Sequence, residues 1–141
     1  MKNLYTAHAV SVGGRSGHVE TDDKRLAFDL TPSLSKTGTN PEQLFACGYA
    51  ACFGSALDAV AKKEKLDTGA ITVKIDVELN QDESGGFSLA ATINVTLEHL
   101  DKTQSEKLVN LAHHICPYSK ATRGNIPVTL KVNDQPLAKA A

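Results

Sequence analysis

Apolar and polar residues alternate along two stretches in the middle of the chain, residues 71–79 and residues 87–97. A repeat of two residues is the period of a β-strand that buries one face. Between the two stretches, residues 81–86 read Gln-Asp-Glu-Ser-Gly-Gly, and glycines of this kind suit a tight turn between antiparallel strands. The pattern therefore predicts an antiparallel hairpin at the centre of the chain.

Shorter strand signals stand at both ends of the chain. Val128, Leu130 and Val132 repeat the two-residue period near the C-terminus. The first 30 residues contain short extended runs, one of them at 7–12, which is broken by Gly-Gly-Arg-Ser-Gly at 13–17. We expect short strands in both regions and a turn at 13–17.

A long helical segment lies between these regions. Asn40 can cap a helix that has a proline at the next position and Gln43 three residues after the cap. The segment runs to about Lys65, so a helix of about 24 residues would be about 36 Å long. Gly48 and Gly54 interrupt it, each at a cost of about 1 kcal/mol relative to alanine. We therefore expect another backbone to pack closely against the helix at the glycines.

A second helix is predicted before the C-terminal strand. Thr103 and Glu106 can form a capping box, and Pro117 should stop the helix directly after Cys116. Its apolar face contains Leu108, Leu111, Ala112 and Ile115. Two helices among antiparallel strands, without a repeat or linker, predict one α+β domain that covers residues 1–141.

Composition limits the partners and the location of the protein. Only 5% of the residues are aromatic, so the core must be largely aliphatic. The net charge is −1, with 15 basic and 16 acidic residues mixed along the chain, and no basic patch indicates nucleic acid or a membrane surface. The N-terminus lacks the apolar stretch of a signal peptide, and no run approaches the roughly 20 residues of a membrane span. We expect a cytoplasmic protein.

The three cysteines, Cys47, Cys52 and Cys116, are the main candidates for chemistry. An odd number of thiols in a reducing compartment argues against a framework of structural disulfides. A thiol attacks a peroxide only as the thiolate, and a free cysteine with a pKa of about 8.5 is mostly protonated at neutral pH. Cys52 would lie in the middle of the long helix, where burial raises its pKa further.

A buried thiolate at Cys52 therefore needs a fixed positive charge, and Arg15 in the glycine-rich turn is a candidate because arginine stays protonated. At about 4 Å and an effective dielectric of about 20, that charge contributes roughly 4 kcal/mol, or about three pKa units. Glu42 is a candidate carboxylate to hold the arginine. Ordinary structural roles remain open for all three residues, as a core thiol, a solvated turn arginine and a helix-dipole glutamate.

Four segments of the chain share a family pattern, and they lie at 13–17, 40–46, 48–53 and 116–125. On these motifs the chain resembles the organic hydroperoxide resistance proteins, a branch of the osmotically inducible protein C superfamily, over essentially its full length. One departure is Cys47, which stands where the family often has alanine.

The resemblance implies a function and a site. Cys52 would be the peroxidatic cysteine, Cys116 the resolving cysteine, and Arg15 and Glu42 the ion pair that activates the thiolate. It implies reduction of organic hydroperoxides through a sulfenic acid and an intramolecular disulfide, which lipoylated proteins or dihydrolipoamide would reduce. It also implies an intertwined homodimer with the long helices at its centre and the sites at the subunit interface, and no metal, haem or flavin.

A substrate pocket is a further expectation. Phe45, Phe53 and Leu57 would form an aliphatic and aromatic lining that favours alkyl or fatty-acid hydroperoxides over hydrogen peroxide. Ordinary core packing of the same three side chains is an equally open interpretation. Gly13, Gly14 and Gly17 also suggest a mobile Arg15 loop, which we expect to open once the thiolate is consumed, because the oxidised site loses the charge that holds Arg15.

Other site types fit the sequence less well. Cys47 is five residues from Cys52, about 140° round a helix, so we expect it to be buried and dispensable. His113, His114 and Cys116 resemble metal ligands, but adjacent histidines point in different directions and no second cluster completes a tetrahedral set.

The turn at 13–17 lacks the lysine and the following helix of a phosphate-binding loop. Two other function classes remain open, a redox sensor and a non-catalytic ligand-binding protein. Multiple turnovers with a dithiol reductant would exclude the sensor.

Overall fold

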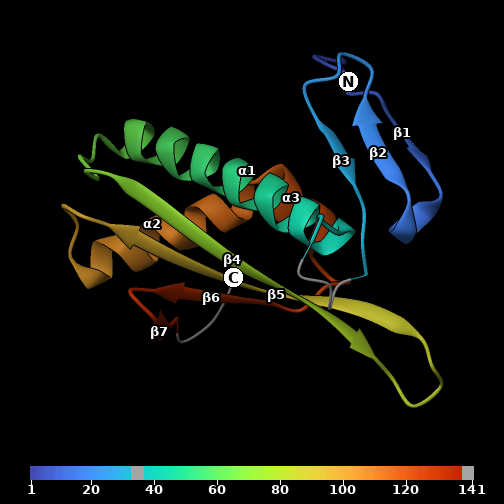
Figure 1. The fold of residues 1–141 in the computed structure, drawn as a ribbon. Coiled ribbons are helices and arrows are strands. Elements are labelled where there is room, and N and C mark those ends of the chain that lie inside the picture. The colour runs from blue at the N-terminus through green and yellow to red at the C-terminus, as the bar shows by residue number, and fades with distance from the viewer. Residues whose placement is uncertain (33–36, 138–141) are drawn as a thin grey trace. The chain divides into compact units, whose positions relative to one another are not determined.

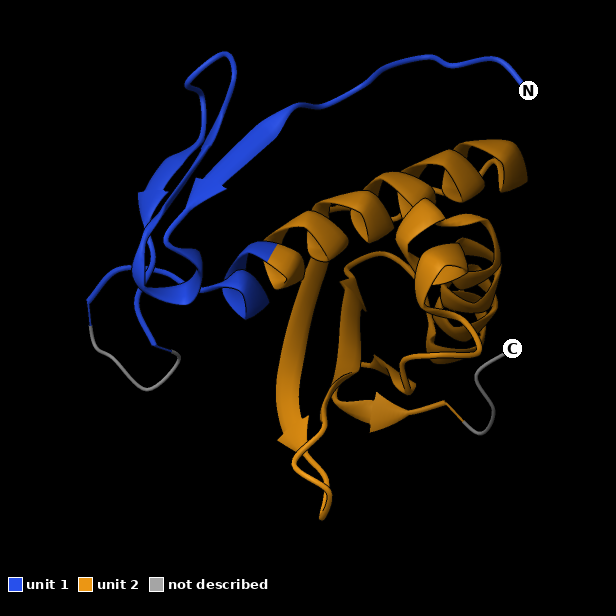
Figure 2. Cartoon of the chain, turned by 90° about the vertical axis from the view of Figure 1, so that its right-hand side faces the viewer, with its two compact units in different colours: residues 1–44 blue, residues 45–141 orange. Residues whose placement is uncertain are grey.

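A computed structural model describes residues 1–32 and 37–137 of the chain (Figure 1). The chain divides into two compact units, residues 1–44 and residues 45–141, which are coloured separately in Figure 2. Each unit is described by itself below. That the whole chain forms one domain stays a prediction.

The first unit contains a three-stranded antiparallel sheet in the order β1-β2-β3. Its strands are β1 (Ala9–Val12), β2 (His18–Thr21) and β3 (Ala27–Asp29), and the short helix η1 (Gly14–Ser16) lies in the turn between β1 and β2. Gly13 precedes η1 with a φ of 82°, a left-handed conformation that glycine adopts without strain. The predicted short strands and the turn at 13–17 are confirmed.

This sheet exposes large apolar side chains. Val10 is 50% exposed, Val12 71%, Leu26 52% and Phe28 38%. By the strand register, Val10 and Val12 point to one face of the sheet, whereas Phe28, which is paired with Val19, points to the other. The first unit therefore presents apolar surface that the chain does not bury.

The second unit contains a four-stranded sheet in the order β4-β5-β6-β7. Its strands are β4 (Ile71–Gln81), β5 (Phe87–Leu97), β6 (Val128–Val132) and β7 (Gln135–Pro136). β4 and β5 are antiparallel, with Ile71 opposite Leu97, whereas β5 and β6 are parallel. The central hairpin and the C-terminal strand are confirmed, and β7 was not anticipated.

The described residues also form three α-helices, α1 (Pro41–Glu64), α2 (Lys102–Ile115) and α3 (Pro117–Thr122). α1 and α2 lie on one face of the four-stranded sheet (Figure 1). The core between them contains fully buried aromatic and aliphatic side chains, among them Tyr49, Phe53, Leu57, Ile93, Leu108 and Leu130. Helices packed on mostly antiparallel sheets confirm the predicted α+β class.

The predicted cap and length of α1 are confirmed. Asn40 Oδ1 accepts a hydrogen bond from the Gln43 backbone N–H at 2.9 Å, which satisfies a free donor of the first turn.

The expectation of backbone packing at the glycines is wrong at Gly48. A Cβ placed there would lie 2.8 Å from the hydroxyl oxygen of Tyr118, so the close neighbour is a side chain.

The predicted start of the second helix is wrong by two residues. The cap of α2 is Asp101, which forms a capping box with Gln104 in place of Thr103 with Glu106. The carboxylate of Asp101 accepts from the Gln104 N–H at 2.8 Å, and an aspartate is at least as good a cap as a threonine.

The predicted end and apolar face of this helix also need correction. Pro117 does end α2, but it begins α3 as well, because proline is compatible with the first position of a helix. Leu108 and Ala112 are buried as expected, whereas Leu111 and Ile115 remain 36% and 41% exposed. Part of the apolar face therefore does not reach the core.

Within the described residues, α1 is long and apolar enough by length and composition to cross a membrane, and 33% of that window is buried. The expectation that no run approaches a membrane span therefore underestimated this segment. The buried side chains of α1 form one side of the core with the sheet and α2. We therefore interpret α1 as a core helix.

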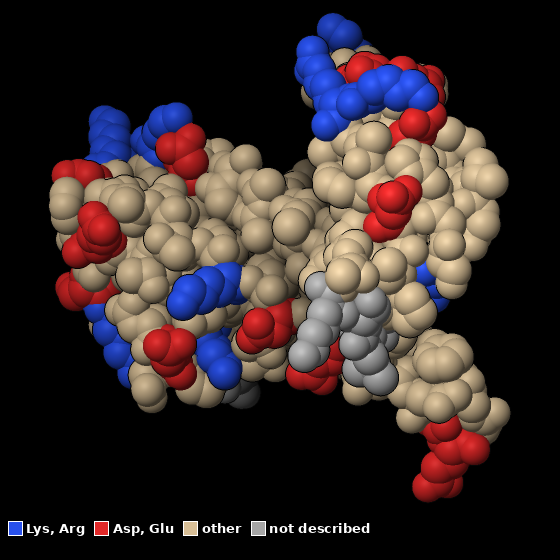
Figure 3. All heavy atoms as spheres, viewed as in Figure 1, with Lys and Arg blue, Asp and Glu red and all other residues tan. Residues whose placement is uncertain are grey.

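Basic and acidic side chains are interspersed over the face of the molecule drawn in Figure 3. Several are paired within helices, such as Lys62 with Asp58 at 2.6 Å. Such exposed pairs contribute about 0–1 kcal/mol each.

Candidate active site

Two thiols that are 64 residues apart in the sequence meet in the second unit. The Sγ atoms of Cys52 and Cys116 lie 3.6 Å apart, close enough for one thiol to donate a hydrogen bond to the other. Cys52 is partly buried in the middle of α1, Cys116 is fully buried, and both are free thiols. The S–S bond of a disulfide is about 2.05 Å long. The two sulfur atoms must therefore move closer together before a bond can form.

The junction of α2 and α3 sets the position of Cys116. Its N–H donates to the Ala112 carbonyl at 2.8 Å, and its own carbonyl accepts from the Lys120 N–H at 2.9 Å. Its ψ of 125° is extended, as expected for a residue before a proline, because Pro117 disfavours the helical conformation there. Cys116 is therefore held by a helix on each side.

The surroundings of Cys52 within the second unit disfavour its thiolate. Burial is the main cause that raises the pKa of the Cys52 thiol, and the hydrogen bond with Cys116 raises it further. The backbone N–H of Tyr118 acts in the opposite direction and lowers the pKa. Within the second unit, these contacts together favour the thiol form of Cys52 over the thiolate.

The sequence analysis missed the contact between Tyr118 and Cys52, because it did not predict a helix that begins at Pro117. Tyr118 is the second residue of α3, where backbone N–H groups have no partner within the helix. The signal in the sequence was Pro117, a residue common at the first position of a helix. Recognising it would have predicted a helix that begins directly after Cys116, with a free N–H group at Tyr118.

A buried polar cluster next to the thiol pair was also missed. The Ser119 hydroxyl forms hydrogen bonds with the Tyr49 hydroxyl at 2.9 Å and with His113 Nδ1 at 3.0 Å. Thr122 lies 3.3 Å from the same tyrosine hydroxyl. Burial first, and then Arg123 and His114, lower the pKa of His113, so its ring is held as the neutral imidazole.

The described residues, 1–32 and 37–137, contain no group of three or more histidine, cysteine or acidic side chains arranged to hold a metal ion. Of the three residues considered for such a site, His113 is hydrogen-bonded to Ser119 and Cys116 contacts Cys52.

Arg15 and Glu42 form a two-pronged ion pair in the first unit. Arg15 Nη1 lies 2.8 Å from Glu42 Oε2, and Arg15 Nη2 lies 2.5 Å from Glu42 Oε1. The hydrogen bond from Arg15 lowers the pKa of the Glu42 carboxyl, and the same bond raises the pKa of Arg15. The fork of an arginine matches a carboxylate in this geometry.

The turn that carries Arg15 depends on Gly17. A Cβ at this position would lie 1.8 Å from the carbonyl oxygen of Val12, so no other residue fits without a change of backbone. The structure thus brings Arg15 to Glu42 and Cys52 to Cys116. The two pairs belong to different units, and each is described within its own unit.

The three residues expected to line a substrate pocket lie at or inside the core. Phe53 and Leu57 are fully buried. Phe45 is partly buried, with its ring centre 5.8 Å from that of Tyr49 and 6.0 Å from that of Tyr118. Phe45 is thus the most accessible of the three, and it lies beside the start of α3.

The expectation that Cys47 is buried is wrong. Cys47 is exposed in the chain, on a face of α1 that also exposes Gln43, Ala51 and Ser55. These residues follow a spacing of four, which keeps them on one side of a helix, while Tyr49 and Phe53 face the core.

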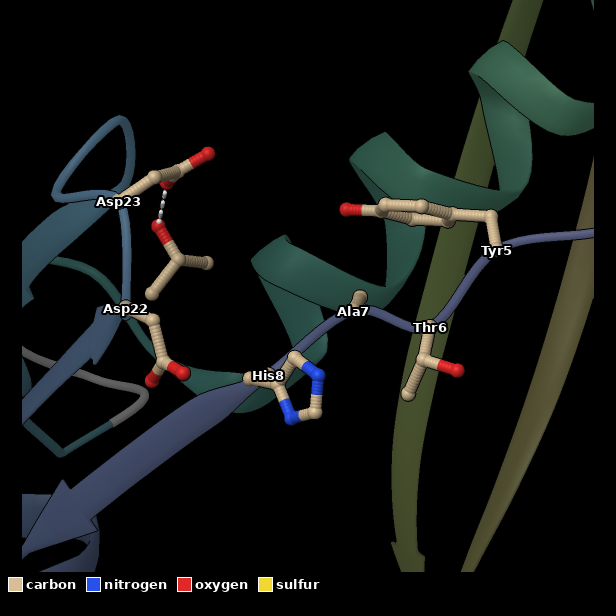
Figure 4. A pocket seen from close by; sticks show the side chains of 7 residues that line it. Tyr5, Thr6, Ala7, His8, Asp22 and Asp23 are labelled. Atoms are coloured by element: carbon tan, nitrogen blue, oxygen red, sulfur yellow. Dashed lines mark hydrogen bonds between the residues drawn. The ribbon is translucent and has the colours of Figure 1, made fainter.

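Among the pockets formed by residues 1–32 and 37–137, two lie away from the thiol pair. One, of about 230 Å³ in the first unit, is lined by Tyr5, His8, Asp22 and Asp23 among others (Figure 4). Asp23 in this pocket accepts a hydrogen bond from the Thr21 hydroxyl at 2.7 Å. Its carboxylate therefore stabilises the turn between β2 and β3. The other, of about 280 Å³, is lined by side chains of α1 and α2. Phe45, Phe53 and Leu57 line neither pocket.

The fold and the thiol pair define an α+β protein with two free cysteines in contact. The chain belongs to the OsmC-like protein family, whose pattern matches residues 34–131. It is 49% identical over 134 residues to the organic hydroperoxide resistance protein OhrB of Bacillus subtilis, covering 92% of this chain and 98% of that protein. It is 44% identical over 133 residues to an organic hydroperoxide resistance protein-like protein of Staphylococcus aureus, covering 92% and 95%.

Solved structures agree with this assignment. The crystal structure of OhrB from Bacillus subtilis has a TM-score of 0.87 at 47% identity, covering 92% of this chain and 99% of that one. An organic hydroperoxide resistance protein OsmC from Legionella pneumophila has a TM-score of 0.88 at 44% identity, covering 93% and 98%. The family inferred from the sequence motifs is therefore confirmed.

Proposed function

We propose that this protein is a cysteine-based peroxidase that reduces organic hydroperoxides to alcohols. The observation that carries the proposal is the 3.6 Å contact between Cys52 Sγ and Cys116 Sγ. It supports an attacking thiol paired with a resolving thiol. The relatives at 49% and 44% identity are named for organic hydroperoxide resistance, which supports the choice of substrate.

The proposed reaction has two chemical steps and a reductive step. The Cys52 thiolate attacks one oxygen of the hydroperoxide, the O–O bond breaks, and the alcohol leaves with a proton while Cys52 becomes a sulfenic acid. The Cys116 thiol then attacks the Cys52 sulfur, an S–S bond forms and water leaves. A dihydrolipoyl group reduces the disulfide by thiol exchange and becomes a disulfide itself.

The raised pKa of Cys52 supports a role for Arg15 as the activating charge. Burial and Cys116 both raise the pKa of this thiol, so a thiolate at neutral pH needs a compensating cation. Arg15 carries the fixed charge, and Glu42 orients it through the two-pronged pair. The proposed role of Glu42 is to hold the guanidinium, because glutamate itself would repel a thiolate.

We also propose that the working form is the intertwined homodimer. Two features support it, the exposed apolar side chains of the β1–β3 sheet and the position of β4 at the edge of its sheet. β4 is 11 residues long, and a long unpaired edge strand normally requires cover.

The substrate class is proposed to be alkyl and fatty-acid hydroperoxides. Phe45 and the ring of Tyr118, whose centres lie 6.0 Å apart, supply partly accessible apolar surface in the second unit. Phe53 and Leu57 would support that surface from the core.

The location is proposed to be the cytoplasm. The free thiols of all three cysteines support a reducing, cytoplasmic location.

The test is a steady-state peroxidase assay with dihydrolipoamide as reductant, which compares an alkyl hydroperoxide with hydrogen peroxide. We expect many turnovers and a higher kcat/KM for the alkyl hydroperoxide. A single turnover would favour a redox sensor, and no oxidation of thiols would favour a ligand-binding protein. Equal kcat/KM for both peroxides would contradict the proposed preference of the apolar surface for alkyl hydroperoxides.

Subunit complementation tests the dimer. We expect copies with Cys52→Ser to be inactive alone and copies with Glu42→Gln to be weakly active alone. If each site takes residues from two copies, mixed dimers regain part of the activity. Mixtures that stay as inactive as their components contradict a shared site.

A further inference from the structure

The start of α3 carries both groups that reach Cys52 in the second unit. Cys116, the residue before the helix, has its Sγ 3.6 Å from Cys52 Sγ. Tyr118, the second residue of the helix, has a backbone N–H that lowers the pKa of the Cys52 thiol. The place of α3 against α1 therefore sets the surroundings of the thiol.

α3 is too short to be positioned by its own stability. It has six residues, whereas isolated helices shorter than about 12–15 residues are marginal in water. Its position must come from contacts with neighbouring elements. Of its side chains, Ser119 is fully buried and Thr122 is 2% exposed, so polar groups face the interior.

The hydroxyl of Ser119 joins three helices. It forms hydrogen bonds with the Tyr49 hydroxyl of α1 at 2.9 Å and with His113 Nδ1 of α2 at 3.0 Å. Tyr49 is fully buried and His113 is 5% exposed. Buried hydrogen bonds are strong because no water competes, and a partner left alone costs about 1–3 kcal/mol.

The cluster is spaced evenly about the thiol pair. Tyr49 lies three residues before Cys52 on α1, and His113 and Ser119 lie three residues on either side of Cys116. Each member thus lies about one helical turn from a thiol. None of the hydrogen bonds of the cluster involves a sulfur atom.

We propose that Tyr49, Ser119 and His113 form a positioning network that holds α3 so that Cys116 reaches the sulfenic acid of Cys52. This rests on the proposed peroxidase function. In the step concerned, Cys116 Sγ bonds to Cys52 Sγ, the S–O bond of the sulfenic acid breaks, and water leaves with the thiol proton. The network acts on the approach of the two sulfur atoms.

The network should therefore matter more for resolution than for attack. A misplacement of about 1 Å can slow a reaction by up to about a hundredfold. When resolution slows, the sulfenic acid persists, and a second hydroperoxide molecule oxidises it to the sulfinic acid. Slow resolution with nearly normal attack is thus the signature of the network, because a loss of folded protein would lower the rates of both steps together.

The variants are Ser119→Ala and Tyr49→Phe, each of which removes one hydroxyl from the network and leaves both cysteines in place. Ser105→Ala is the matched control. Ser105 is also a fully buried serine of the second unit, on α2, but its hydroxyl has no hydrogen-bond partner among the described residues. Its removal changes a buried serine without touching the network.

The experiment is a single turnover of the reduced full-length chain with an alkyl hydroperoxide, quenched at intervals and analysed by intact mass for sulfenic acid, disulfide and sulfinic acid. We expect formation of the sulfenic acid to slow much less than resolution in Ser119→Ala and Tyr49→Phe, because the attacking sulfur stays on α1 and only the Tyr118 N–H moves with α3. Disulfide formation should slow by about tenfold or more, and sulfinic acid should accumulate. Ser105→Ala should match the wild type.

Wild-type resolution in both variants would overturn the proposal, and so would an equal slowing of attack and resolution. Tyr49→Phe keeps the buried ring and carries the test by itself if Ser119→Ala does not fold. A wild-type protein that forms neither sulfenic acid nor disulfide would instead refute the peroxidase function.

Discussion

The hydroxyl of Tyr118 occupies the space that a side chain at Gly48 would need. A Cβ at position 48 would lie 2.8 Å from Tyr118 Oη and 3.3 Å from two ring carbons. The tyrosine ring also packs against Tyr49, with ring centres 5.6 Å apart. A missing side chain on α1 thus makes room for the ring of the residue whose N–H faces Cys52.

Gly48→Ala should therefore displace the Tyr118 ring. Alanine gains about 1 kcal/mol in helix propensity, but loss of the contacts with Phe45 and Tyr49 costs about 0.5–1.5 kcal/mol each. Gly54→Ala is the control, because its Cβ would lie 3.8 Å from Val73 Cγ2, an ordinary contact. In urea unfolding we expect Gly54→Ala to be more stable than Gly48→Ala by about 1 kcal/mol or more, and equal stabilities would contradict this.

The three cysteines should differ in their contribution to turnover. We expect Cys52→Ser to abolish reduction of an alkyl hydroperoxide, since it removes the attacking sulfur. Cys47→Ser should keep near wild-type kcat/KM, because Cys47 is exposed and is not in contact with Cys52 on the helix. Activity of Cys52→Ser in the dihydrolipoamide assay would refute the mechanism.

Cys116→Ser should separate the two chemical steps. The attacking thiol remains, so a first equivalent of hydroperoxide is still consumed, but no intramolecular disulfide can form. We expect the Cys52 sulfenic acid to be trapped by dimedone and to proceed to the sulfinic acid with excess oxidant. Wild-type multiple turnover by this variant would exclude Cys116 as the resolving thiol.

The ion pair predicts a dependence of stability on pH. Arg15 lowers the pKa of Glu42 in the folded state below its ordinary value of 4.5, so the folded protein favours the carboxylate. This contribution is fully present above the ordinary pKa and is lost as the pH falls through the lowered value. We expect Glu42→Gln to cost up to about 1 kcal/mol near neutral pH and almost nothing near pH ~2.

Urea unfolding of the wild type and Glu42→Gln across this pH range measures the difference directly. Glu78→Gln is the control, since Glu78 is an exposed carboxylate of β4. A difference between Glu42→Gln and wild type that does not shrink at acid pH would show that the pair is not the cause.

The cap of α2 gives a prediction that separates two neighbouring residues. Asp101→Ala removes the side chain that accepts from the Gln104 N–H and should cost about 1 kcal/mol. Thr103→Ala changes an exposed residue inside the first turn and should stay within about 0.5 kcal/mol. Thermal or urea unfolding of both variants tests the assignment, and a larger loss for Thr103→Ala would contradict it.

Local patterns in the sequence determined the elements. The alternation at 71–79 and 87–97 specified the hairpin, and Asn40 with Gln43 specified the start of α1, because both signals depend on residues a few positions apart. The four motifs also identified the family and with it Cys52, Cys116, Arg15 and Glu42 as candidates. These features need no knowledge of which distant residues meet.

Only the tertiary structure decided which residues surround the thiols. The exposure of Cys47, the ring of Tyr118 over Gly48 and the cluster at Ser119 depend on which face of α1 packs against the sheet and against α3. Tyr49 and Ser119 are 70 residues apart, and no periodicity connects them. Burial turns an ordinary serine and tyrosine into strong partners, because their hydroxyls lose water and must find each other.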